Sequence, residues 1–108
     1  KRTFGSDFLT SPSGFDSHGE LLIIAELRAR LAVLDRDDRL VTYLGANLEV
    51  CDGDGWPNVK NEQGESVRPP LLEEGKFNSP HGMAVDPDGN IYVAEWLIGG
   101  RFTKLAKR

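Results

Sequence analysis

His81 is the residue of this 108-residue sequence with the clearest potential for chemistry. It lies in the segment 79–82 (SPHG), immediately before residues that favour a β-strand. Imidazole is the commonest metal ligand in proteins, and it also forms hydrogen bonds with backbone groups. Two interpretations therefore stay open for His81: a metal ligand, or a structural histidine bonded to the backbone at the start of a strand.

The second histidine and the single cysteine indicate no site of their own. His18 lies within 16–20 (DSHGE), a hairpin turn in which we expect its side chain to be exposed. Cys51 has no second cysteine to pair with and no histidine close in sequence, so neither a disulfide nor a catalytic thiol is indicated. The sequence also lacks a phosphate-binding loop, a nucleophile elbow and an HExxH motif.

Two acidic, glycine-containing segments, 51–56 (CDGDGW) and 86–90 (DPDGN), have the residue types of calcium loops but not their pattern. A calcium loop needs carboxylates at further alternating positions and a later bidentate glutamate, which both segments lack. Asp, Asn, Pro and Gly are also the residues that form tight turns. We therefore predict turns in both places, the second formed by Asp86, Asp88 and Gly89.

Glutamate and arginine recur as pairs between runs of strand-forming residues. Glu26 precedes Arg30, and Glu95 precedes Arg101. At the ends of adjacent strands, such side chains can meet in a charge-assisted hydrogen bond that orders the turn. The alternative is that one of the carboxylates acts as a general base or supports a site.

Composition narrows the class of protein. The chain has 13 basic and 17 acidic residues, a net charge of −4, and no basic run, so we expect no nucleic-acid or membrane partner. The longest apolar stretch, 21–25, is far too short to span a bilayer. The amino end does not resemble a signal peptide, which makes the cytoplasm the default expectation, and a first residue other than Met is consistent with trimming.

An internal repeat decides the predicted secondary structure. Residues 20–36 are rich in helix formers with apolar side chains three and four apart, so a helix is a serious alternative there. However, 11–14 (SPSG) matches 79–82 (SPHG), and each is followed by a glycine turn, an apolar run ending in Ala-Glu, and an arginine that opens another run. The second copy favours strands, because 91–93 (IYV) follows the turn at 86–90. The repeat therefore predicts strands in the first copy too.

We predict two β units with a long loop between them. The first unit, 11–45, has strands at about 13–17, 21–27, 30–35 and 39–44, with a turn at 35–38. The second unit, 77–108, has strands at about 82–86, 91–96 and 101–106 and lacks a fourth. Residues 46–76 show no sustained periodicity and are predicted to be a loop, while 1–5 are a spare strand.

The stretch 77–96 (FNSPHGMAVDPDGNIYVAEW), followed by Gly100 and Arg101, closely resembles an NHL repeat, and 11–44 resembles a diverged copy. With the ending 43–45 (YLG), the arrangement is similar to the last part of bacterial propeller proteins related to peptidyl-α-hydroxyglycine α-amidating lyase. The resemblance implies an all-β fold, a six-bladed β-propeller of four-stranded blades around a channel. This chain has material for two blades, fewer than the three repeats usually needed for stability.

This incompleteness predicts self-association. Residues 1–5 of one chain are expected to complete the second blade of another. Three chains of two blades make six, so we predict a cyclic homotrimer; the alternative is that the chain is a fragment of a longer propeller. We expect Trp96 to pack within or between blades, and Trp56 to cover a channel face or a neighbouring chain.

Two functions stay open. The favoured one is a binding or assembly module of unknown ligand, since a fold alone assigns no chemistry. The alternative is a metal-dependent lyase or hydrolase: in the amidating lyases, histidines in similar Pro-His segments bind zinc, and a trimer would bring His81 of three chains together with one coordination position open. The lyases also use an Arg and a Tyr on the substrate, and Tyr43 and Tyr92 lie in predicted strands, so neither is a ready match.

Overall fold

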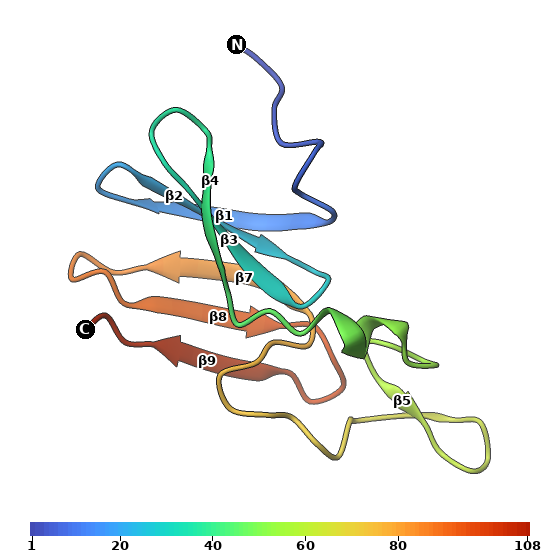
Figure 1. The fold of residues 1–108 in the computed structure, drawn as a ribbon. Coiled ribbons are helices and arrows are strands. Elements are labelled where there is room, and N and C mark those ends of the chain that lie inside the picture. Colours follow the sequence, from blue (N-terminus) through green and yellow to red (C-terminus); the bar gives the residue numbers. More distant parts are fainter.

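The structure, a computed structural model, describes all residues 1–108 and consists of two antiparallel sheets and a small hairpin (Figure 1). The first sheet contains, in spatial order, β1 (Pro12–His18), β2 (Leu21–Glu26), β3 (Arg30–Leu34) and β4 (Leu40–Leu44). The second contains β7 (Pro80–Val85), β8 (Ile91–Glu95) and β9 (Arg101–Leu105). The predicted all-β fold is confirmed, and the seven strands predicted within 11–108 lie within two residues of their expected bounds, whereas the spare strand predicted at 1–5 does not form in the single chain.

The helix considered for residues 20–36 does not form, because this segment folds into β2 and β3. The apolar residues of β3 lack a strict alternation because both faces of this strand are covered, and every residue of β3 is buried. One face of the first sheet packs against the second sheet, and the other is covered in part by Phe8 and Leu9.

The main core lies between the two sheets. β7 packs alongside β1 and also touches β2, so the first strands of the two sheets are neighbours (Figure 1). Ile23, Ala25, Leu31 and Val33 of the first sheet meet Phe77, Ile91 and Val93 of the second unit. The two sheets are therefore stacked face to face, as successive blades of a propeller are.

The segment 46–76 is more ordered than the sequence predicted. It contains a 3-10 helix, η1 (Leu48–Asp52), and a hairpin of β5 (Val59–Lys60) and β6 (Ser66–Val67). The Trp56 indole donates a hydrogen bond to the carbonyl oxygen of Asn78 at 2.9 Å, and the Arg68 guanidinium donates to the carbonyl of Gly100 at 2.6 Å. These bonds fix the segment to the second sheet, so within one chain Trp56 is a half-buried internal contact.

Residues 1–5 form no strand in the single chain. The backbone turns back at Gly5, whose carbonyl oxygen accepts a hydrogen bond from the Leu9 amide at 2.8 Å. The pairing predicted for this segment needs a second chain and stays a prediction. No helix in the structure combines the length and apolar character that crossing a membrane requires.

Candidate binding surface

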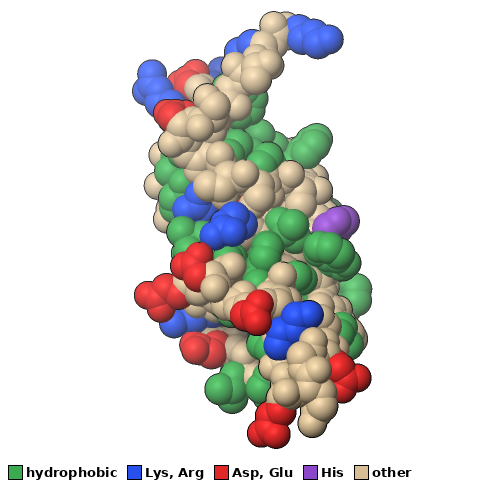
Figure 2. All heavy atoms as spheres, turned by 90° about the vertical axis from the view of Figure 1, so that its right-hand side faces the viewer, with side chains coloured by type: hydrophobic (Ala, Val, Ile, Leu, Met, Phe, Trp, Pro, Cys, Tyr) green, Lys and Arg blue, Asp and Glu red, His purple; other side chains and the backbone are tan.

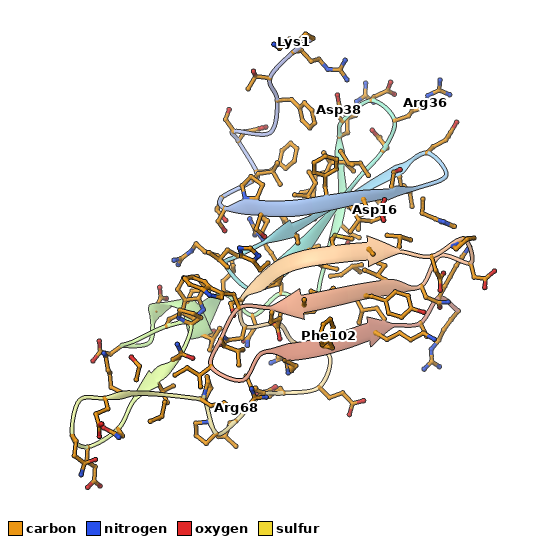
Figure 3. The ribbon with its side chains drawn as sticks, turned by 180° about the vertical axis from the view of Figure 1, so that it is seen from behind. Lys1, Asp16, Arg36, Asp38, Arg68 and Phe102 are labelled. Atoms are coloured by element: carbon orange, nitrogen blue, oxygen red, sulfur yellow. The ribbon has the colours of Figure 1, made fainter.

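The second sheet has one uncovered side, which we name the open face: the side chains of Ala84, Tyr92, Ala94, Phe102 and Lys104. Strand pairing places these residues in two cross-strand rows, Ala84–Tyr92–Lys104 and Ala94–Phe102. Phe102 is 87% exposed on β9, the edge strand that lies farthest from the first sheet (Figure 3). Lys104 adds a positive charge, and its ammonium lies 5.6 Å from the centre of the Tyr92 ring. An apolar strand face left in water makes this side of the sheet a candidate binding surface.

The internal repeat shows what the open face corresponds to in the first sheet. Aligning Glu26 with Glu95 and Arg30 with Arg101 sets Ile23 against Tyr92, Leu31 against Phe102 and Val33 against Lys104. Ile23, Leu31 and Val33 are buried in the core between the sheets. The open face is thus the counterpart of the surface on which the second sheet itself packs.

The outer side of the first sheet corresponds to the side of the second sheet that packs against the first sheet. Its buried residues Ile24, Ala32 and Leu34 correspond to Val93, Thr103 and Leu105, which face the first sheet. Phe8 and Leu9 cover part of this side, but a hollow of about 610 Å³ remains, lined by Phe4, Phe15, Leu22 and Ile24 among others. Phe15 at its rim is 74% exposed. Figure 2 shows hydrophobic side chains on the surface between charged ones.

The predicted glutamate–arginine pairs both form, and their role is structural. Arg30 bonds the buried Glu26, and Arg101 bonds the buried Glu95. The second oxygen of each carboxylate accepts backbone amides from just before β1 or β7: Glu95 takes those of Asn78 and Ser79 at 2.5 and 3.1 Å. Each pair therefore fixes the entry into the first strand of its sheet. Because all polar atoms of these carboxylates are satisfied and the carboxylates are shielded from solvent, a general-base role has no support.

His81 is exposed on β7, and its imidazole takes part in none of the hydrogen bonds of the structure. The structural alternative, a backbone bond at the strand start, is therefore not formed in the single chain. Its nearest aromatic neighbour is Trp96, whose ring centre lies 6.2 Å away. Trp96 is itself mostly exposed, so the packing predicted for it does not occur within one chain. No group of three or more His, Cys, Asp or Glu side chains lies close enough to hold a metal.

The turn predicted at 86–90 forms, whereas in the segment 51–56 Cys51 and Asp52 belong to η1 and a turn follows from Asp54. Asp86 caps the β7–β8 turn, and hydrogen bonds, chiefly from the Asn90 side chain, lower its pKa to about 2. The pKa of Asp16 is also lowered, mainly by a bond from the Val85 amide across the two sheets. Burial raises the pKa of the Cys51 thiol, which argues against a reactive thiolate. His18 is half-buried at the end of β1, so the prediction of an exposed turn histidine is only partly met.

Residues 77–96 match the NHL repeat. This stretch covers β7, β8 and the turn between them, and it includes His81 and the capping residue Asp86. The match and the stacked all-β sheets together fit two blades of an NHL-type propeller, the kind of protein-binding module that the repeat builds. Neither the curated proteins nor the solved structures contain a match to the chain.

The sequence analysis considered Tyr92 only as a possible substrate-binding tyrosine, for which it was no ready match, and it did not single out Phe102. The alternation in 91–95 and 101–105 gives each strand two distinct faces, and it does not tell which face stays uncovered. The signal that would have identified the open face was the repeat itself, because it aligns Phe102 with the core residue Leu31.

Proposed function

We propose that this chain is a propeller-type assembly module whose open face binds the outer side of the first sheet of a second copy. The observation that carries the proposal is the alignment of Tyr92, Phe102 and Lys104 with residues that already lie buried under a neighbouring sheet. A partner with the same geometry as the second sheet would present side chains equivalent to Ile91 and Val93. Only the outer side of the first sheet offers such side chains, namely Leu22 and Ile24.

Both surfaces belong to one chain and lie on opposite sides of it, so the contact is head to tail. Such a contact closes into a ring when the rotation between copies fits, and otherwise it extends into a filament. Three copies supply the six blades that the resemblance to the amidating-lyase propellers implies. The product is a cyclic homotrimer, which would offer its channel and the segment 46–76 to a protein or small ligand.

The test is the solution mass of the 108-residue chain and of Phe102→Asp, measured by light scattering after gel filtration. We expect the mass of three chains for the parent protein and of one chain for Phe102→Asp, because a buried unpaired carboxylate is costly. Leu71→Asp is the matched control, since Leu71 is 86% exposed in the loop and lies on neither surface. A parent chain that stays a monomer at high concentration would contradict the proposal.

A zinc site at His81 is a second candidate that depends on the same assembly. The supporting observation is the exposed imidazole without a hydrogen-bond partner at the first strand of its blade. Three copies would supply three imidazoles and leave one position open for water, as catalytic zinc requires. Metal analysis of the assembled protein should find about one zinc per three chains, and none in His81→Ala. Equal metal contents in the two proteins, with His18→Ala as the control, would exclude this site.

A further inference from the structure

The free edge of β9 is the second incomplete feature of the second sheet. In the first sheet β3 pairs with β4, whereas β9 has no strand on its outer side. A groove of about 630 Å³ follows this edge, lined by consecutive residues of β9 and, across from them, by Leu72, Glu74 and Gly75. Unpaired backbone groups along a strand edge bind an additional extended segment readily.

Gly5 and Gly45 hold equivalent positions, which identifies the segment that fits this groove. Gly45 directly follows β4 with φ of 62°, and its carbonyl oxygen accepts a hydrogen bond from the Phe77 amide at 3.0 Å. Gly5 has φ of 94°, and its carbonyl oxygen accepts the Leu9 amide at 2.8 Å. A Cβ on either glycine would lie about as close to the side chain that follows, 2.5 Å from Phe77 and 2.6 Å from Leu9.

Leu9 and Phe77 are themselves equivalent in the repeat. Leu9 opens the segment 9–12 (LTSP), as Phe77 opens 77–80 (FNSP). The amide that follows each of them bonds the buried glutamate of its sheet, Thr10 to Glu26 and Asn78 to Glu95, both at 2.5 Å. Each glycine therefore joins the end of one blade to the start of the next.

It follows that the residues before Gly5 correspond to the end of β4. Phe4 is the counterpart of Leu44, which packs against the core between the two sheets. Phe4 in turn lines the hollow on the outer side of the first sheet, where the proposed neighbour would lie. Its side chain is thus already placed at an interface between blades, and only the sheet on the other side is lacking.

We infer that residues 1–4 form the fourth strand of the second sheet of another copy, antiparallel to β9; this inference rests on the proposed assembly. The β3–β4 pairing sets the register: Leu31 faces Leu44 and Ala32 faces Tyr43, so Phe4 faces Phe102 and Thr3 faces Thr103. The segment cannot reach its own β9. Four extended residues span at most about 14 Å, and the amino end and β9 lie on opposite sides of the molecule (Figures 1 and 3).

A disulfide trap tests the register. Thr3→Cys and Thr103→Cys are combined with Cys51→Ala, which removes the native thiol, and the protein is oxidised at micromolar concentration. Directly paired residues of antiparallel strands lie within disulfide range. We expect covalent dimers and trimers on a non-reducing gel, with intact monomer in the control Ser66→Cys/Thr103→Cys/Cys51→Ala. Ser66 lies on β6, outside the proposed contact.

Deletion of residues 1–4 separates this inference from the proposed function and needs no cysteine variant to fold. We expect the deletion to raise the dissociation constant of assembly about tenfold or more, since strand pairing and Phe4 are both lost. If the deleted chain assembles as tightly as the parent while Phe102→Asp does not assemble, the strand inference is wrong and the face contact stands. Equal cross-linking in the Ser66 control also overturns it. A monomeric parent chain overturns both.

Discussion

The hydroxyl of Ser13 donates a hydrogen bond to the carbonyl oxygen of Pro80, 2.9 Å away, and so joins the first strands of the two sheets. Three residues further along β1, the Asp16 carboxylate accepts the Val85 amide at 2.7 Å. Gly14 between them permits this approach, because a Cβ there would lie 3.0 Å from the carbonyl oxygen of His81. The contact between blades is therefore polar along its inner strands and apolar behind them.

Ser13→Ala should lower the free energy of unfolding by about 1 kcal/mol, the usual net contribution of one hydrogen bond. The Ser13 hydroxyl also lies 3.1 Å from the carbonyl oxygen of Ala25, so the substitution removes the donor that the carbonyl oxygens of Pro80 and Ala25 share. Urea denaturation measures the change. Ser17→Ala on the same strand is the control, because the Ser17 hydroxyl makes no hydrogen bond and its loss should change the stability little.

Glu95→Ala should be far more destabilising, by about 3 kcal/mol or more, since it leaves Arg101 without its carboxylate and the amides of Asn78 and Ser79 without an acceptor. Glu26→Ala should cost a similar amount, because Glu26 holds the equivalent place. The exposed Glu62 makes no ion pair, and Glu62→Ala serves as the control. Equal unfolding midpoints for Glu95→Ala and Glu62→Ala would show that the buried pair contributes nothing.

The Asp86 carboxylate should make stability depend on pH in the acid range. Its pKa is about 2 in the folded protein, against 3.8 for a free side chain. The folded state therefore gains stability from the ionised form above about pH 4, and this gain is lost as the pH falls toward about 2. In Asp86→Asn the gain is absent, and Asn61 shows that an asparagine can cap such a turn, since its side chain accepts the Gln63 and Glu65 amides.

The measurement is the melting temperature of both proteins across that pH range. The melting temperature of Asp86→Asn should lie below that of the parent protein, and this difference should be largest above pH 4 and should shrink toward pH 2. Asp88→Asn, in the same turn but without such bonds to its carboxylate, is the control. A deficit that does not change with pH would contradict this assignment.

The strands could be predicted because the repeat aligns an ambiguous segment with a clear one. Residues 20–36 read alone fit a helix as well as strands, and their match to 91–105 decides for strands. The turns followed from local chemistry, since Asp35 and Asp86 each cap the backbone two residues on. The β5–β6 hairpin was missed because its strands have two residues each, although the Asn61–Gly64 turn has the same capping pattern.

The site was harder to foresee than the fold. The sequence singled out His81 by residue type, and the single chain gives that side chain no partner through which to act. What marks Phe102 is exposure combined with equivalence to a buried leucine, and exposure is a property of packing that no local pattern contains. The glutamate–arginine pairs were predictable because adjacent strand ends bring their side chains together whatever surrounds them.

Gly45→Ala tests the junction that Gly5 repeats. An alanine at this position is unfavourable for two reasons. The backbone is left-handed, and the alanine Cβ would lie 2.5 Å from the Phe77 ring. We expect a loss of free energy of unfolding of about 1–2 kcal/mol from the left-handed backbone and a further 1–3 kcal/mol, roughly, from overpacking. Gly64→Ala isolates the backbone contribution, because Gly64 has φ of 77° with no atom near its Cβ position. Equal losses by urea denaturation in the two variants would show that the Phe77 contact is not tight.

Arg2→Thr should strengthen assembly. The register inferred above sets Arg2 opposite Lys104, as Thr42 lies opposite Val33, and like charges across strands repel. Removing one charge should lower the dissociation constant up to about fivefold. This factor corresponds to about 1 kcal/mol, the upper end of the energy of a cross-strand pair. The exposed ion pair of Arg2 with Asp38 is lost as well, but pairs of this kind stabilise the free chain little. Lys1→Thr changes the net charge equally at the position of Val41, which has no opposite residue in β3, and should leave the constant unchanged. Sedimentation equilibrium compares the three proteins, and equal tightening by both variants would attribute the effect to net charge and contradict the register.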